Sequence, residues 1–240
     1  MKHIGILLAG GSSKRMKQPG KDKLLHPIRK TNAFRLCYQA FAGSPEIENI
    51  IIVYRNENQK TLLKKEIDLV HKELRSDFKP IFTQGGKERM HSVANALANC
   101  PESCEFVYIH DCARPMITSA TINKLKDIVS KEGAAVIARP LHDTVKKILN
   151  LDPDKKHFSS LTESVDRNKI WIMETPQCSN IGWLREGIKV AEEKNILATD
   201  EVSILELVER PVSLVNPHYP NPKITAPTDF TFINFLLSQA

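Results

Sequence analysis

The sequence predicts an α/β protein with a mostly parallel sheet and helices on both of its faces. Apolar runs rich in β-branched residues recur along the chain, and segments with the apolar spacing of helices lie between them. Strands that alternate with helices in this way form parallel sheets that are covered on both sides. A length of 240 residues suits one large domain, so we expect a single domain over residues 1–240.

The individual elements follow from the same pattern. The expected strands are HIGILLAG near the start, 49–54, 80–84, 106–111 and 134–140, and the helices between them lie at about 32–43, 57–75, 88–99 and 119–131. Later elements are a helix at about 180–194, a helix with Thr199 as its N-cap, the strands PVSLVN and KIT, and a last helix from about 227.

The segment at about 142–172 interrupts this alternation. It is charged and lacks long apolar strands, which indicates a hairpin-like β-arm that projects from the sheet. Such an arm buries little surface by itself, so we expect it to pack against a second copy of the chain and to serve in dimerisation.

Composition excludes several classes of protein. Hydrophobic residues are 41% and charged residues 26% of the chain, as in ordinary globular proteins. No apolar run is long enough to span a bilayer, and the five cysteines contain no CxxC pair, so we expect a protein of the reducing cytoplasm. The net charge of +6 favours anionic partners, but aromatic residues are only 6%, which disfavours nucleic acid.

The loop after the first strand has the composition of a phosphate-binding loop. Ala9, Gly10 and Gly11 end the strand, and five basic residues follow within 14–23. Glycines let backbone N–H groups approach phosphate oxygens, and the basic side chains can offset the charge of a triphosphate. The spacing matches neither GxGxxG nor GxxxxGK[ST]. A solvated lysine loop is the simpler interpretation, but ligands of open α/β sheets bind beside this loop.

Two further clusters follow later strands. In one, Gly86 opens a helix whose first turn carries Arg89 and Ser92, which is either an anion-binding turn or an ordinary helix start. In the other, Asp111 ends a strand, where its carboxylate can hold a magnesium ion or cap a helix. Three clusters at three strand ends favour one site that binds nucleoside triphosphate.

Taken together, these segments resemble the 2-C-methyl-D-erythritol 4-phosphate cytidylyltransferases of the non-mevalonate pathway of isoprenoid precursor synthesis. The resemblance runs nearly end to end, through LAGGSSKRM, KLL, GGKERMHS, HDCARP, DTVK, VDRNKIW, TPQ, TDE and PKIT. It implies a Rossmann-like sheet with a projecting arm, a homodimer, CTP as the nucleotide, a phosphorylated polyol as the acceptor, and Mg²⁺ or another divalent cation.

The resemblance also implies a role for individual residues. Arg15 and Lys23 match the basic pair that holds the triphosphate, with Lys21 as a competitor for Lys23, and Lys223 matches a lysine that reaches the α-phosphate. Asp111 matches the metal ligand. The residues assigned to the nucleotide are Ala9, Gly10, Gly11, Gly86, Arg89 and Ser92. The acceptor is assigned to Arg167 and Thr199, with Thr144 and Thr175 nearby, and the arm that carries Arg167 would come from the partner subunit.

One departure keeps two alternatives open. Relatives place Asp-Asn-Ile before the late lysine, whereas this chain has Pro220, Asn221 and Pro222. Ribitol-5-phosphate cytidylyltransferases also tend to lack that aspartate, although VDR at 165–167 favours the erythritol enzyme. A catalytically silent nucleotide-binding protein with the same fold is the alternative from another class.

Overall fold

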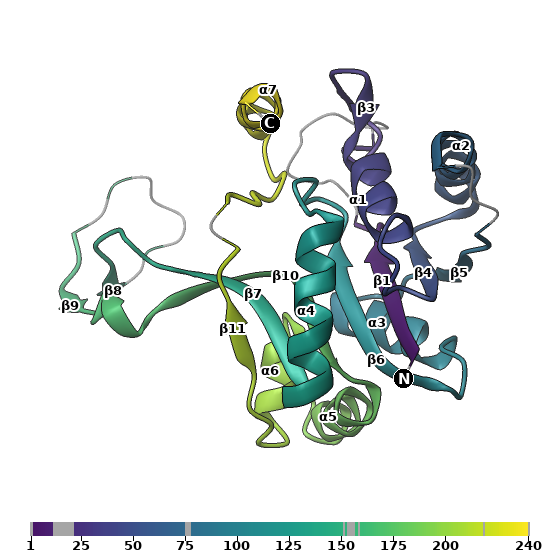
Figure 1. Cartoon of the computed structure of the whole chain (residues 1–240). Helices are drawn as coiled ribbons and strands as arrows, with labels where there is room; N and C mark the ends of the chain where they lie inside the picture. The colour runs from purple at the N-terminus through teal and green to yellow at the C-terminus, as the bar shows by residue number, and fades with distance from the viewer. Residues whose placement is uncertain are drawn as a thin grey trace.

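A mixed sheet of seven strands forms the centre of the molecule, seen in a computed structural model that describes residues 2–11, 22–74, 78–150, 152, 157, 159–217 and 219–239 (Figure 1). The strand order is β11-β7-β10-β6-β1-β4-β5. The strands are β1 (Lys2–Leu8), β4 (Asn49–Tyr54), β5 (Ile81–Gln84), β6 (Cys104–Asp111), β7 (Ala134–Pro140), β10 (Trp171–Asn180) and β11 (Ser213–Val215). Within this sheet β10 is antiparallel to both of its neighbours, and the other pairs are parallel. The predicted α/β fold with a mostly parallel sheet is confirmed.

Helices cover both faces of this sheet, as expected. One hydrophobic cluster joins the sheet to α1 (Ala33–Ala42), α2 (Glu57–Leu74), α4 (Ser119–Glu132) and α7 (Thr228–Gln239). The cluster on the opposite face involves α3 (Arg89–Ala98), α5 (Ile181–Glu193) and α6 (Glu201–Glu206). Neighbouring residues of β1 pack into opposite clusters, since Leu7 belongs to the first and Ile6 to the second.

The chain reverses its direction of progress across the sheet at β1. After β1 it adds β4 and then β5 on one side, and it returns to place β6 on the other side of β1. Such a switch point opens a crevice at the carboxyl ends of the two central strands, and ligands of open α/β sheets bind there. The loops after β1 and β6 therefore lie at the preferred position for a site.

The predicted arm is present as a separate hairpin. Strands β8 (Lys146–Ile148) and β9 (Thr162–Ser164) pair antiparallel and project from the sheet beyond β7 and β10 (Figure 1). All six of their residues are exposed. A second small hairpin, β2 (Pro27–Ile28) and β3 (Thr31–Asn32), precedes α1.

Strand β10 is the longest strand of the sheet, and the sequence pattern does not predict it. Its pattern is broken by Glu174, Pro176 and Gln177, and the register with β7 shifts between Met173 and Gln177. Glu174 and Gln177 are buried because β10 lies between β6 and β7, and their side chains are paired with Arg139 and Asp200 of neighbouring segments. The order of polar and apolar residues over 171–180 therefore does not indicate a strand.

Two local predictions were wrong. Asp200, and not Thr199, is the N-cap of α6, because the Asp200 side chain accepts a hydrogen bond from the backbone N–H of Ser203. The KIT segment at 223–225 forms no strand, and the backbone N–H of Ile224 instead donates to the carbonyl of Ala113 at 2.8 Å. Across the described ranges, the helices include none that is both long and apolar enough to cross a membrane.

Candidate active site

A cavity of about 700 Å³ lies at the carboxyl ends of β1, β4, β5 and β6, at the switch point. It brings together eight of the residues that the sequence singled out: Gly10, Gly11, Lys23, Gly86, Arg89, Ser92, Asp111 and Lys223. Ala9 is fully buried beside the cavity, where its N–H donates to the carbonyl of Val53 and its own carbonyl accepts from Gln59. Ala9 thus holds the end of β1 in place.

The turn after β5 depends on glycine. The Gly85 N–H donates to the Tyr54 carbonyl at 2.8 Å, and the Gly86 N–H donates to Oγ of Ser92 at 3.0 Å. A Cβ at Gly86 would lie 2.4 Å from the Cβ of His91, so no other residue fits this backbone without a shift. The tight turn places the first turn of α3, with Arg89 and Ser92, at the cavity wall.

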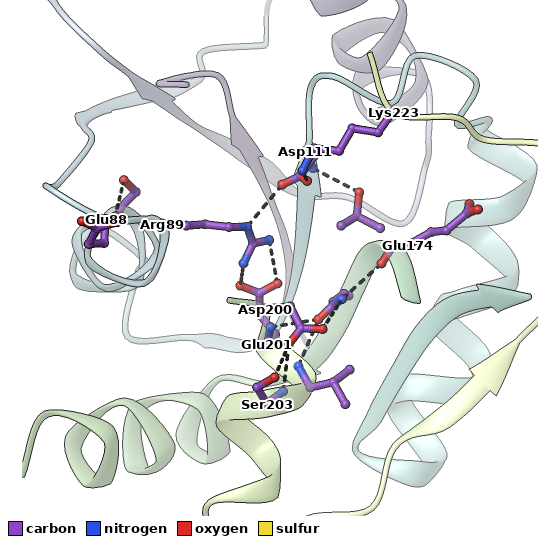
Figure 2. A network of polar contacts seen from close by, with 12 residues as sticks. Glu88, Arg89, Asp111, Glu174, Asp200, Glu201, Ser203 and Lys223 are labelled. Atoms are coloured by element: carbon purple, nitrogen blue, oxygen red, sulfur yellow. Dashed lines mark hydrogen bonds and ion pairs between the residues drawn. The ribbon is translucent and has the colours of Figure 1, made fainter. Parts of the chain in front are cut away.

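Asp111 is the acidic centre of the site (Figure 2). One carboxylate oxygen lies 2.6 Å from Nζ of Lys223 and the other 3.3 Å from Nε of Arg89. Burial would raise the pKa of Asp111, but the two cations together outweigh it and hold the pKa well below its usual range. Asp111 is therefore an anion at neutral pH.

Arg89 is held more tightly by a second carboxylate than by Asp111. Its two terminal nitrogens donate to the two oxygens of Glu201 at 2.7 and 2.9 Å, a paired geometry that gives strong, directional hydrogen bonds (Figure 2). Burial raises the pKa of Glu201, and the guanidinium opposes this shift. The pair joins α3 to α6, and Glu201 was not singled out from the sequence.

A buried chain of hydrogen bonds supports the end of β6. Oγ1 of Thr175 accepts from the backbone N–H of Asp111 at 3.1 Å and lies 2.9 Å from Nδ1 of His110. Thr175 is 4% exposed, and Asn221 donates to its carbonyl. In this structure the Thr175 hydroxyl thus orients the strand that carries Asp111.

Lys23 reaches the cavity from the loop before α1, where its Nζ donates to the carbonyl of Ile224 at 2.7 Å. Asp22 fixes this loop, because its carboxylate accepts from Gln59 at 2.6 Å and from Arg55 at 3.2 Å. Arg55 also lines the cavity and donates to the carbonyl of Gly11. Arg55 was not singled out from the sequence, although it directly follows the strand 49–54.

None of the four residues assigned to the acceptor lines this cavity: Thr175 is buried behind Asp111, and the other three are Thr144, Arg167 and Thr199. Thr144 and Arg167 lie on the arm, and the Arg167 guanidinium donates to the carbonyl of His142 at 2.7 Å. Thr199 is exposed just before α6. Arg15 and Lys21 fall outside the described residues.

The residues present fit a divalent cation that is held jointly with substrate. Among the described residues, no group of three His, Cys, Asp or Glu side chains gathers to form a complete metal site. Mg²⁺ commonly binds through one or two carboxylates, water and phosphate oxygens, so the single carboxylate of Asp111 suits a cation that arrives with a triphosphate. This cation would neutralise phosphate charge during transfer.

Comparison with known proteins agrees with the geometry. The family model for 2-C-methyl-D-erythritol 4-phosphate cytidylyltransferase matches residues 4–239. The chain is 32% identical to the enzyme of that name from Dictyoglomus thermophilum over 240 residues, which covers 100% of this chain and 98% of the relative. It is 31% identical to the Bacillus velezensis enzyme, with 99% and 96% covered.

Solved structures share the fold. The synthase of 4-diphosphocytidyl-2C-methyl-D-erythritol from Anaerococcus prevotii superposes with a TM-score of 0.81 at 21% identity, covering 99% of this chain and 96% of that one. The Francisella tularensis cytidylyltransferase gives 0.76 at 23% identity, with 98% and 99% covered. With a match from residue 4 to residue 239, the chain belongs to the 2-C-methyl-D-erythritol 4-phosphate cytidylyltransferase family.

Proposed function

We propose that this enzyme transfers the cytidylyl group of CTP to 2-C-methyl-D-erythritol 4-phosphate and releases pyrophosphate, a step of the non-mevalonate isoprenoid pathway. The observation that carries the proposal is the cavity at the switch point. It combines glycine turns with the cations Lys23 and Lys223 and the carboxylate of Asp111 between Lys223 and Arg89. This set suits a triphosphate with an accompanying cation.

The reaction needs positioning and charge compensation more than covalent catalysis. A phosphate oxygen of the acceptor forms a bond to the α-phosphorus of CTP, while the bond from that phosphorus to the departing pyrophosphate breaks on the opposite side. Lys223, together with Arg15 and Lys23, would hold the charge that develops on the transferred group. Gly10 and Gly11 would bind the nucleotide through backbone N–H groups, and the turn at Gly86 would place Arg89 and Ser92 beside it.

The arm suggests that the acceptor site needs two subunits. Arg167 and Thr144 do not line their own cavity, and Leu149 and Leu161 on the same arm are 49% and 70% exposed. A second copy of the chain would cover these apolar side chains and receive Arg167 in its site. We also propose a cytoplasmic location, because the five cysteines are all free thiols.

Subunit mixing tests the shared site. Arg167→Ala and Lys223→Met should each be nearly inactive alone. Mixed after dissociation, they should regain about a quarter of wild-type activity, because half of the dimers are mixed and each has one intact site. No recovery in verified mixed dimers would place Arg167 outside the partner's site.

A panel of acceptors tests the reaction itself. Pyrophosphate release is measured with CTP, Mg²⁺ and either 2-C-methyl-D-erythritol 4-phosphate or ribitol 5-phosphate, and we expect the erythritol compound to be preferred. Pro220, which stands where relatives have aspartate, is the observation that favours ribitol 5-phosphate as a second candidate. Faster turnover of ribitol 5-phosphate would reverse the assignment, and no release with either acceptor would refute transfer.

A further inference from the structure

The two terminal nitrogens of the Arg89 guanidinium, which we call its fork, point away from Asp111. Both terminal nitrogens are used by Glu201, and only Nε contacts Asp111, at 3.3 Å (Figure 2). That distance exceeds the usual range for N–H···O hydrogen bonds, so the contact with Asp111 is the weaker one. Glu201 is 1% exposed and needs a cation to balance its charge.

Glu201 is itself fixed by the neighbouring strand. Oε1 of Gln177 on β10 accepts from the backbone N–H groups of Glu201 and Val202 at 2.9 and 3.0 Å. Nε2 of Gln177 donates to Asp200, the N-cap of α6, at 3.1 Å. The backbone from which the Glu201 carboxylate projects is therefore held by β10 and does not depend on Arg89.

The alternative partner of the fork would be Asp111. A guanidinium can offer its paired terminal nitrogens to only one carboxylate at a time. If the charge at position 201 were absent, Asp111 would be the nearest remaining anion that Arg89 contacts. A cation would then have to displace a charge-paired arginine, in addition to Lys223, in order to reach Asp111.

We propose that Glu201 is a positioning residue that holds the fork of Arg89 away from Asp111, and thereby limits the competition between Arg89 and the divalent cation that accompanies CTP for the Asp111 carboxylate. The inference rests on the proposed function, since it assumes that a cation binds at Asp111. It also means that Arg89 affects metal binding through Asp111. The family resemblance alone assigns Arg89 to the nucleotide.

The test is a calorimetric titration of CTP without acceptor, so that no turnover occurs, over a series of Mg²⁺ concentrations. Glu201→Gln keeps the size of the side chain and removes its charge. It should raise the Mg²⁺ concentration needed for half-maximal CTP binding by about tenfold, the effect expected for coupled charges in contact. CTP binding in EDTA should change by less than about twofold, because backbone N–H groups are unaffected.

Two further variants separate positioning from a general structural role. Glu201→Asp keeps the charge and should restore most of the Mg²⁺ affinity. In the double variant Arg89→Met with Glu201→Gln, no arginine remains to occupy Asp111, so the Mg²⁺ requirement should return to near the wild-type value. If circular dichroism shows that Glu201→Gln does not fold, the double variant is used for the test. It leaves neither charge of the Arg89–Glu201 pair without its partner.

Each outcome decides the matter. An unchanged Mg²⁺ requirement in folded Glu201→Gln overturns the inference, as does an equal loss of CTP binding with and without Mg²⁺, which indicates a structural role. A raised requirement in the double variant also overturns it. If wild-type CTP binding does not respond to Mg²⁺, the metal assignment in the proposed function fails, which the acceptor panel with and without EDTA would show independently.

Discussion

Replacing Lys223 by methionine is the sharpest test of the charge arrangement in the cavity. The substitution keeps the length and apolar stem of the side chain and removes the ammonium that lies 2.6 Å from Asp111. Removing one preorganised charge donor from a transfer site costs about 2.7–4 kcal/mol of transition-state stabilisation. We therefore expect kcat/KM to fall by about 10²–10³-fold.

Stability should change far less than activity. Asp111 keeps Arg89 at 3.3 Å after the substitution, so its charge is not left alone. The Lys223 side chain is 37% exposed, and solvent screens its ion pair. We expect the free energy of unfolding to fall by only about 1 kcal/mol, and urea denaturation measures this directly.

The assay follows pyrophosphate release with CTP, acceptor and Mg²⁺, at a temperature where circular dichroism shows both proteins folded. Lys189→Met is the matched control, because Lys189 is 78% exposed on α5 and pairs only distantly with Glu193 at 3.9 Å. The control should keep wild-type turnover. Loss of less than about threefold for Lys223→Met would refute a direct role for this lysine in transfer.

Three further predictions address other parts of the chain. Arg15→Ala should lower turnover by about 10²–10³-fold if the loop after β1 supplies charge to the triphosphate, and near-normal turnover would remove Arg15 from the site. Gly86→Ala should weaken CTP binding in calorimetry, because the new Cβ meets His91 at 2.4 Å, whereas His91→Ala should leave turnover within about twofold. Burial lowers the pKa of His3, with the positive charge of Lys126 adding to the effect and Glu46 and Glu48 opposing it. The stability that neutral His3 supports is complete above its unfolded pKa and is lost as pH falls below it, so urea denaturation at about pH 7.5 and about pH 5 should show a larger loss for wild type than for His3→Gln.

Elements with an uninterrupted pattern were predictable from the sequence. The strands at 49–54 and 134–140 have the bounds expected for them, because each is a buried run of β-branched or small apolar residues. The strand β10 was not predictable, because Glu174 and Gln177 lie in its buried half. Their partners, Arg139 and Asp200, come from other elements, so local alternation carries no sign of them.

The segments that form the site were predictable from the sequence, but the ion pairs between their side chains were not. Glycines and charges after strands identify the loops that share one edge of the sheet, and this placed Gly86, Asp111 and Lys23 correctly in the cavity. The order of strands decides which of these loops are neighbours. The partners of Arg89 are 22 and 112 residues away, at Asp111 and Glu201, and no local pattern links such positions.

The pairing of Arg89 also bears on how many cations compete for Asp111. Among the described residues, no group of three His, Cys, Asp or Glu side chains gathers to form a complete metal site, and Asp111, the carboxylate at the end of β6, already has cations facing both of its oxygens. A chain with one such carboxylate must limit the competition for it, since each competing cation lowers its affinity for metal. Lys223 is free to turn toward phosphate when substrate enters, because its side chain is 37% exposed, but Arg89 is anchored in the wall. The buried charge of Glu201 is then the feature that limits this competition, because it occupies both terminal nitrogens of Arg89.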